Sequence, residues 1–273
     1  MKKPKIALTI AGTDPTGGAG VMADLKSFHA CGVYGMAAVT SIVAQNTKGV
    51  QHIHNLETQW LSEQLSSVFD DELPHAIKTG MIASKDMMKV IQEYLEAYPD
   101  IPYVIDPVML AKSGDSLMDD DAKKDLQNIL LPLATVATPN LPEAEEITGL
   151  TIDNEASIYK AGKIFINEIG SKGVVIKGGH AEDLDIAKDY LFTKENVYTF
   201  EDPRYETKHT HGTGCTFSAV ITAELAKGKS IFEAVKKAKA FISLSIKYTP
   251  EIGQGRGPVN HFAYMKKVGL DDE

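Results

Sequence analysis

Residues 5–20, KIALTIAGTDPTGGAG, begin with a mostly apolar run and end in a turn that contains several glycines. The run at 5–12 is far too short to span a bilayer, and its apolar residues are typical of a strand that is buried on both faces of a sheet. Helical spacing follows the glycine-rich turn through about residue 31. A strand, a turn and a helix in this order form the repeating unit of α/β proteins.

The same unit recurs along the chain. We interpret GMAAVTSIVAQN (35–46) as the second strand and TQWLSEQLSSVF (58–69) as the helix after it. The apolar face of this helix consists of Trp60, Leu61, Leu65 and Val68. Four further short runs rich in β-branched residues are predicted strands: HAIKTGMI (75–82), PYVIDPVM (102–109), ATVATPN (134–140) and GVVIKGG (173–179). This alternation predicts a mostly parallel, doubly wound sheet with helices on both faces.

The last third of the chain departs from the alternation. DYLFTKENVYTF (189–200) predicts a hairpin that turns at 194–196, and hence a small antiparallel edge on the sheet. Two predicted helices, at 215–227 and 230–248, and a turn-rich segment follow. No linker, repeat or low-complexity segment divides the 273 residues, so we expect one domain spanning 1–273.

The charge of the chain bears on its partners. There are 28 Lys and Arg residues against 37 Asp and Glu residues, a net charge of −9, and no basic block longer than a pair. This balance argues against nucleic acid or an anionic membrane as the main partner, whereas a small anionic substrate needs only local dipoles and one or two lysines. Two cysteines without a CxxC pattern argue against a disulfide framework and a zinc cluster. We interpret the N-terminus as a strand rather than a signal peptide and expect a cytoplasmic protein.

Polar residues gather at the ends of the predicted strands, where ligands bind in an open α/β sheet. Asp106 and Asn140 end two of these strands, and Glu143 follows Asn140 closely. Their oxygens suit Mg²⁺, bound directly or through water, and Lys177 at another strand end suits phosphate oxygens. Any one of these residues is equally well explained by an ordinary turn, but their placement at equivalent positions indicates a ligand site.

HTHGTGCTFSAV (209–220) contains the strongest candidate for an anion site. Gly212, Thr213 and Gly214 form a turn that opens a predicted helix, where backbone N–H groups converge and the helix dipole favours negative charge. The chain has no GxGxxG motif, which argues against a dinucleotide site. It also has neither the GxxxxGK[ST] phosphate-binding motif nor a kinase HRD motif. If the protein handles phosphate, the turn at 212–214 is the best candidate to hold it.

Taken together, these segments resemble the hydroxymethylpyrimidine/phosphomethylpyrimidine kinases of thiamine biosynthesis, which belong to the ribokinase superfamily. The resemblance extends from about residue 5 to 262 and departs from the family pattern at Met22, where Gln is usual, and at Thr13, where Ser is usual. Eight blocks carry it in order: LTIAGTDPTGGAGVMADLKSF, YGMAAVTSIVAQNT, IKTGM, VIDPVMLAKSGD, TPNLPEAEEITG, VVIKGGH, HTHGTGCTFSAVITAELAKG and GPVNHF.

The resemblance implies a three-layer ribokinase-like fold, ATP and Mg²⁺ as cofactors, and frequent homodimers. It also implies phosphorylation of a CH₂OH group on a pyrimidine, followed by a second phosphorylation of the resulting phosphate. By the matching positions, the residues implied in catalysis are Cys215, Gly212, Thr213, Gly214 and Lys177. Those implied in binding the pyrimidine are Gln45, Gly12, Asp24, Met81 and Val108, those implied in binding ATP are Lys177, Asn140 and Lys112, and those implied in binding Mg²⁺ are Asp106 and Glu143.

Cys215 stands where many sugar kinases of the superfamily carry aspartate. A phosphate acceptor, with a second pKa of about 6, is largely ionised near neutral pH and needs no strong base. A cysteine at a helix N-terminus has a lowered pKa and can assist the first phosphorylation as a thiolate. The alternative is that Cys215 is a small apolar residue that fills the first helical turn. Cys31 is assigned to the core, Lys112 is explained equally well by a surface loop, and His209 and His211 are expected to support the neighbouring loops.

Three other functions share parts of this pattern: a pyridoxal kinase of the same subfamily, a non-catalytic ligand-binding protein on this fold, and a nicotinamide oxidoreductase. The polar residues at the strand ends argue against the second, and the missing dinucleotide motif argues against the third. Gln45 distinguishes the first, because a side-chain amide offers a donor and an acceptor side by side. An aminopyrimidine carries the complementary amino group and ring nitrogen, and pyridoxal does not. We therefore expect the pyrimidine to be the substrate.

Overall fold

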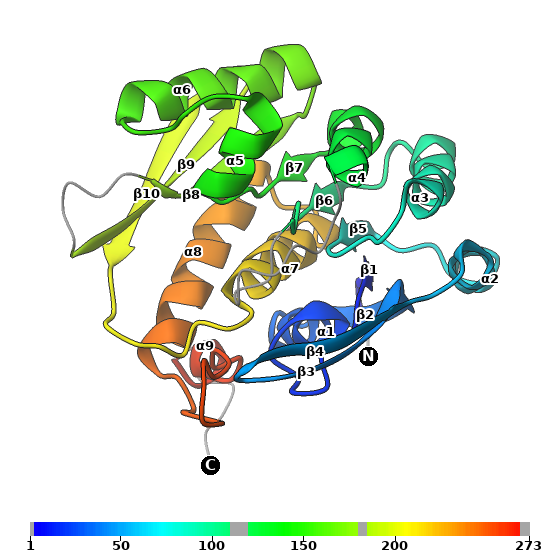
Figure 1. Ribbon diagram of the computed structural model, residues 1–273, viewed down its shortest axis with the longest axis horizontal. Coiled ribbons are helices and arrows are strands. Elements are labelled where there is room, and N and C mark those ends of the chain that lie inside the picture. The colour runs from blue at the N-terminus through cyan, green and yellow to red at the C-terminus, as the bar shows by residue number, and fades with distance from the viewer. Residues whose placement is uncertain (1–2, 110–119, 180–184, 268–273) are drawn as a thin grey trace.

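The computed structural model describes residues 3–109, 120–179 and 185–267 (Figure 1). Across the central sheet, the strands follow the order β10 (Val197–Pro203), β9 (Ile186–Thr193), β8 (Gly173–Gly179), β7 (Val136–Ala137), β6 (Tyr103–Ile105), β5 (Ala76–Thr79), β1 (Ile6–Ala11) and β2 (Tyr34–Val39). Neighbours from β8 to β2 pair in parallel, whereas β8, β9 and β10 pair antiparallel at one edge. The predicted sheet and its antiparallel hairpin at 189–200 are therefore confirmed.

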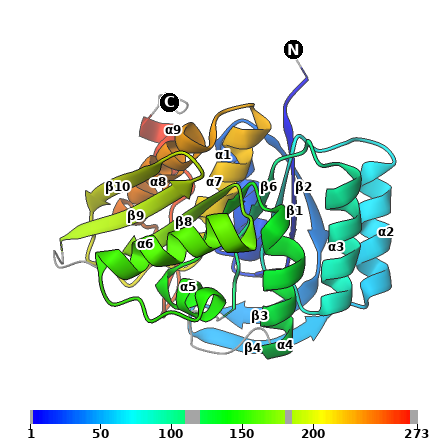
Figure 2. The same ribbon diagram turned by 90° about the horizontal axis from the view of Figure 1, so that it is seen from above.

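Helices cover both faces of the sheet (Figure 2). One face carries α1 (Gly20–Ala30), α7 (Thr213–Ala226) and α8 (Ile231–Lys247). The other carries α2 (Thr58–Phe69), α3 (Lys85–Ala97), α4 (Asp120–Asp125), α5 (Leu141–Thr148) and α6 (Glu155–Ile164), with the short segments η1 (Leu126–Leu130), η2 (Leu131–Leu133) and η3 (Phe165–Ile169). A last short helix, α9 (Ala263–Lys267), packs on α8. Within the described residues, no helix combines the length and the apolar character needed to cross a bilayer.

Two hydrophobic cores form because successive residues of a strand point to opposite faces of the sheet. In β1, Ala7 faces the core under α1, α7 and α8, whereas Leu8 faces the core under α2 to α6. Val104 and Ile105 of β6 alternate in the same way. All four side chains are fully buried. This burial on both faces is what the continuous apolar runs of the sequence predicted.

The prediction of one strand at 35–46 is wrong. Strand β2 ends at Val39, and the next residue, Thr40, donates its backbone N–H to Ala11 O at 3.0 Å and its hydroxyl to Met81 O at 2.8 Å. The chain then leaves the central sheet as β3 (Ser41–Asn46), which pairs antiparallel with β4 (Gly49–Asn55), a strand that the sequence did not predict. These tertiary hydrogen bonds satisfy the backbone where the chain turns, so no glycine or proline is needed to mark the break.

The predicted helix at 58–69 coincides with α2, but one residue of its predicted apolar face is misplaced. Leu61 and Leu65 are fully buried and Phe69 continues their stripe along the helix. Trp60 is 56% exposed, because a residue one position before Leu61 lies about 100° around the helix from it.

His261 gives the protein a predictable sensitivity to acid. It is buried against α7, where its Nε2 lies 3.0 Å from Thr216 Oγ1, and this burial lowers its pKa to about 4. The unfolded chain therefore binds a proton below about pH 6.5 that the folded protein takes up only near pH 4, so stability falls with pH through this window. We expect His261 to remove about 2 kcal/mol of unfolding free energy between pH 7.5 and pH 5.

Urea denaturation of the unmodified protein and of His261→Gln at the two pH values measures this contribution. The variant, whose amide does not titrate, is expected to lose about 2 kcal/mol less than the unmodified protein on acidification. Equal losses in the two proteins would show that His261 stays neutral in the unfolded chain or is protonated in the folded one.

Candidate active site

A cavity of about 440 Å³ opens at the carboxyl ends of the parallel strands. Gly12, Gly80 and Asp106 each follow directly on the last residue of a strand and line this cavity. Asn140 follows β7, and Lys177 is contributed by β8. This is the edge of an open α/β sheet at which ligands bind, as the polar residues at the predicted strand ends indicated.

Helix α7 begins at the cavity with its first turn facing inward. Its N-cap residue, Gly212, has a φ of 77°, and a Cβ atom there would overlap the carbonyl group of Gly18, so only glycine fits. No side chain caps this helix from the Gly212 position, and its first turn contains no acidic residue. Helix α1 also lacks a side-chain cap, but the N–H of Val21 in its first turn donates to Gly12 O at 3.0 Å, and the carboxylate of Asp14 accepts from the N–H groups of Gly18 and Ala19 just before the helix. The positive end of the α7 dipole therefore faces the cavity without a side-chain cap.

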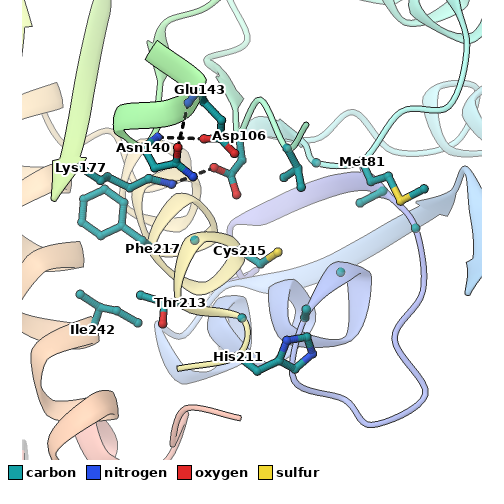
Figure 3. A pocket seen from close by; sticks show the side chains of 18 of the residues that line it. Met81, Asp106, Asn140, Glu143, Lys177, His211, Thr213, Cys215, Phe217 and Ile242 are labelled. Atoms are coloured by element: carbon teal, nitrogen blue, oxygen red, sulfur yellow. Dashed lines mark hydrogen bonds and ion pairs between the residues drawn. The ribbon is translucent and has the colours of Figure 1, made fainter. Parts of the chain in front are cut away.

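Lys177 and Asp106 lie beside this turn (Figure 3). Lys177 Nζ donates to Asp106 Oδ1 at 3.1 Å, and Thr138 donates its hydroxyl to the same oxygen at 2.9 Å. A Cβ atom on Gly214 would lie 3.3 Å from both Asp106 Oδ2 and Lys177 Nζ. Burial alone would raise the pKa of Asp106, but the ammonium groups of Lys177 and Lys78 hold it below its ordinary value. An ionised carboxylate and an ammonium group thus border the turn at 212–214, which we call the anion turn after the prediction made from the sequence.

Asn140 and Glu143 form the start of α5 at the same end of the cavity. The side chain of Asn140 accepts from the N–H of Glu143 at 2.9 Å, and the carboxyl group of Glu143 accepts from the N–H of Asn140 at 2.8 Å. This capping box fixes both side chains. Burial raises the pKa of Glu143 to about 7, so the carboxyl group is only partly ionised at neutral pH.

Cys215 lines the cavity from the first turn of α7, but its acidity differs from the prediction. Burial raises the pKa of its thiol to about 11, whereas a helix N-terminus was expected to lower it. The charge of Lys78 and a hydrogen bond from the N–H of Gly20 to the sulfur act in the predicted direction, but their effect is smaller than that of burial. The thiol form of Cys215 is therefore favoured at neutral pH.

The structure brings four of the five predicted pyrimidine-binding residues to the cavity. Gly12, Gln45, Met81 and Val108 all line it. Figure 3 shows Met81 on the side of Cys215 away from Lys177, and Gly12 lies next to Met81. Gln45 reaches the cavity from β3, at a register shift between Ala44 and Gln45 in its pairing with β4. The predicted ATP-binding residue Lys112 lies outside the described residues.

The fifth residue, Asp24, does not reach the cavity wall as the prediction of direct substrate binding requires. Its side chain is fully buried in α1, where Oδ2 accepts from Lys78 Nζ at 2.8 Å and from Thr9 Oγ1 at 2.6 Å. Its other oxygen, Oδ1, has no hydrogen-bond partner among the described residues. The helical position of Asp24 was clear from the sequence, but its burial against a lysine of a distant strand was not.

The sequence did not indicate the apolar end of the cavity. Phe217 of α7 and Ile242 and Ile246 of α8 line it, next to an ion pair in which Lys239 Nζ lies 2.7 Å from Asp189 Oδ2. In the sequence these apolar residues have the helical spacing of ordinary core positions, so no local signal distinguishes them. Their role as a cavity wall depends on how the two helices pack together.

Both histidines beside the anion turn hydrogen-bond to neighbouring loops, as expected. His209 Nδ1 accepts from the N–H of Gly257 at 3.1 Å, and His211 Nε2 lies 2.7 Å from Asp14 Oδ2. Of the two, His211 also lines the cavity.

Comparison with known proteins supports the family resemblance that the sequence indicated. The family model of phosphomethylpyrimidine kinase matches residues 14–260. A hydroxymethylpyrimidine/phosphomethylpyrimidine kinase of Staphylococcus aureus (strain MSSA476) is 78% identical over 273 residues, which cover 100% of this chain and 99% of the relative. Among solved structures, the ADP complex of Bacillus subtilis pyridoxal kinase is similar with a TM-score of 0.88 and 38% identity, over 96% of this chain and 98% of that one.

A second solved structure, phosphomethylpyrimidine kinase from Clostridium difficile 630, is similar with a TM-score of 0.78 and 42% identity, over 89% of this chain and 99% of that one. The two structural neighbours carry different substrate names on one fold, so the fold alone does not separate the substrates. The family match over most of the sequence and the 78% identity do decide the family. The chain belongs to the phosphomethylpyrimidine kinase family.

Proposed function

We propose that this protein transfers the γ-phosphoryl group of ATP to the hydroxymethyl group of 4-amino-5-hydroxymethyl-2-methylpyrimidine, and then a second one to the resulting monophosphate. The observation that carries this proposal is the uncapped start of α7 beside Lys177 and Asp106, between an apolar slot and the pocket lined by Gln45. Phosphoryl transfer needs positioning and charge stabilisation more than covalent chemistry, and this arrangement supplies both.

ATP fits the apolar end of the cavity. A purine ring can pack against Phe217, Ile242 and Ile246, and its phosphates then extend toward the turn at 212–215 and Lys177. The Bacillus subtilis pyridoxal kinase, whose structure holds ADP, has the same fold over almost the whole chain. In this proposal, the N–H groups of the turn and the ammonium group of Lys177 stabilise negative charge on the transferred group.

Mg²⁺ fits beside Asp106 and Glu143. Within the described parts of the chain, no cluster of three or more His, Cys, Asp or Glu side chains forms a complete metal cage. Magnesium in phosphoryl transfer does not require one, because one or two carboxylates, water and substrate phosphates complete its shell. Asp106 is ionised and its Oδ2 faces the turn, and Glu143 lies buried nearby. When bound there, the ion would neutralise charge on the phosphate oxygens.

The pyrimidine is favoured over pyridoxal by Gln45, which has a side-chain donor and acceptor for the amino group and the neighbouring ring nitrogen. A buried polar group left unpaired costs about 1–3 kcal/mol. Gln45→Met is therefore expected to raise KM for the pyrimidine about 10- to 100-fold, while leaving KM for pyridoxal little changed.

Gln51→Met is the matched control, because Gln51 lies on the neighbouring strand β4 and is exposed. Steady-state kinetics with both substrates for the three proteins measure the effect. If Gln45→Met impairs the two substrates equally, Gln45 does not read the ring.

ATP consumption by the unmodified protein, screened with hydroxymethylpyrimidine, its phosphate and pyridoxal, tests the proposed function directly. Turnover with the first two establishes the two-step kinase. Preference for pyridoxal would instead establish the pyridoxal kinase, and ATP consumption with none of the three would favour a non-catalytic ligand-binding protein. The homodimer and the cytoplasmic location expected from the sequence remain predictions.

A further inference from the structure

Two segments that are far apart in the sequence meet in close backbone contact beside the cavity, at the end where the proposed phosphoryl acceptor, the pyrimidine, would bind. One is the glycine-rich loop at 12–20, here called the acceptor loop, and the other is the segment at 209–214 that leads into α7. A Cβ atom on Gly18 would lie 2.7 Å from Cδ2 of His211, closer than real contacts allow. On the other side, a Cβ atom on Gly212 would overlap the carbonyl group of Gly18. Glycine on both sides thus lets the two backbones touch.

A hydrogen bond between two side chains crosses this contact. His211 Nε2 lies 2.7 Å from Oδ2 of Asp14, a fully buried carboxylate. The same carboxylate accepts from the N–H groups of Thr16, Gly18 and Ala19 at 2.9, 3.1 and 2.8 Å, so it also closes the acceptor loop on itself. The carboxylate is therefore shared between the acceptor loop and the segment before α7.

The backbone of His211 is held in place from the other direction. Its N–H donates to Gly257 O at 3.1 Å, and its carbonyl oxygen accepts from the N–H of Val259 at 3.3 Å. The residue is thus anchored on the C-terminal segment, while its ring reaches over to the acceptor loop. Figure 3 shows its side chain beside the first turn of α7, below Cys215.

The acceptor loop in turn positions two backbone groups close to the proposed site of phosphoryl transfer. Gly12, at its start, lines the acceptor pocket and accepts from the N–H of Val21 at 3.0 Å. Gly20, at its end, donates its N–H to the sulfur of Cys215. A shift of this loop would move the acceptor wall and the Gly20 N–H relative to the anion turn.

We propose that His211 is a positioning residue of the phosphoryl transfer. Through Asp14 it holds the acceptor loop against the start of α7, so that the acceptor oxygen and the transferred phosphoryl group keep a fixed separation. The proposal rests on the kinase function proposed above and assigns no proton transfer to His211. Its expected size follows from the general finding that a displacement of about 1 Å in a reacting pair can slow a reaction about 100-fold.

Replacement of the ring tests this role. His211→Phe keeps a ring but removes the hydrogen bond, and it is expected to lower kcat for both phosphorylations about 10- to 100-fold, with KM for ATP and for the pyrimidine changed less than about threefold. His211→Gln is expected to recover kcat to within about threefold of the unmodified enzyme, because its Nε2 can donate to the same carboxylate. His29→Phe is the matched control, since it makes the same replacement at an exposed histidine of α1 outside both segments and is expected to leave kcat and both KM values unchanged.

Several results would overturn the proposal. Full activity of a folded His211→Phe protein would do so, as would a rise in KM with kcat unchanged, which would make His211 a substrate contact. A His211→Gln enzyme as slow as the phenylalanine variant would also contradict it. Should His211→Phe fail to fold, His211→Leu is measured in its place, with the same expectations.

Amide hydrogen exchange separates this inference from the proposed function. Peptides that cover residues 12–20 are expected to exchange faster in His211→Phe than in the unmodified protein or in His211→Gln, because the loop is then held less tightly. This measurement needs no turnover. An unmodified protein that phosphorylates none of the substrates would refute the proposed function only, whereas unchanged exchange in the phenylalanine variant would refute the positioning role.

Discussion

Gly214→Val is expected to lower kcat for both phosphorylations by about 10²–10³-fold, the loss typical when a donor to developing negative charge is displaced. Gly214 lies in the first turn of α7, and even a single Cβ atom there would approach Asp106 Oδ2 and Lys177 Nζ to 3.3 Å. The two further methyl groups of valine would push the charged side chains away from the turn or turn the N–H groups away from the phosphate. Both steps suffer because both use the same turn.

The fold is expected to survive this change. Gly214 is part of α7, and valine in a helix costs less than about 1 kcal/mol relative to alanine. Gly214→Ala provides a graded comparison, because its one added carbon faces the flexible end of Lys177 and is expected to cause a smaller loss than valine. Single-turnover kinetics and thermal denaturation of the three proteins measure both effects. Normal turnover by Gly214→Val would mean that the phosphates are held elsewhere.

Cys215→Ala is expected to slow the first phosphorylation about 100-fold, within the range typical of general-base catalysis, and the second less than about threefold. The first acceptor is an alcohol that must lose a proton, whereas the second is a phosphate that is already ionised near neutral pH. Because the pKa of Cys215 is raised to about 11, the thiolate fraction rises about tenfold for each pH unit between 7 and 9. The first step of the unmodified enzyme should therefore accelerate over this range, and that of the alanine variant should not.

Cys31→Ala is the matched control, because it removes the other cysteine of the chain, a partly buried residue that packs against the core and whose pKa burial also raises. Rates of the two steps, measured separately from the hydroxymethylpyrimidine and from its phosphate, decide the outcome. Equal losses on the two steps in Cys215→Ala would point to a shared positioning role. A first step that is independent of pH in the unmodified enzyme would exclude the thiolate as the base.

Much of the fold could be predicted because its signals are local. The apolar runs that became β1, β5, β6 and β8 are short and bounded by turn residues, and a strand buried on both faces needs only such a run. The start of α7 after Gly212 is likewise set by a local motif, since glycine allows the left-handed backbone conformation from which this helix begins. That the turn at 212–214 holds an anion remains a prediction.

The break at Thr40 had no such signal. Its backbone N–H and its hydroxyl donate hydrogen bonds to the carbonyl oxygens of Ala11 and Met81, residues far away in the sequence. Because no turn residue marks the break, GMAAVTSIVAQN is read as one strand. The position of Gln45 changed with it: the residue reaches the cavity from the two-stranded sheet β3–β4 and not from the end of a central strand.

The sequence by itself determined the alternation of strands and helices, the antiparallel edge, the start of the helix after Gly212 and the family, because each depends on residue order within a short window or on ordered blocks along the chain. Only the tertiary structure decided which side chains share a cavity and how they ionise. Asp24 is paired with Lys78 beneath the wall, the thiol form of Cys215 is favoured, and Phe217 faces the cavity while having the spacing of a core residue. Burial and charge are sums over neighbours from distant segments, and these neighbours exist only once the chain has folded.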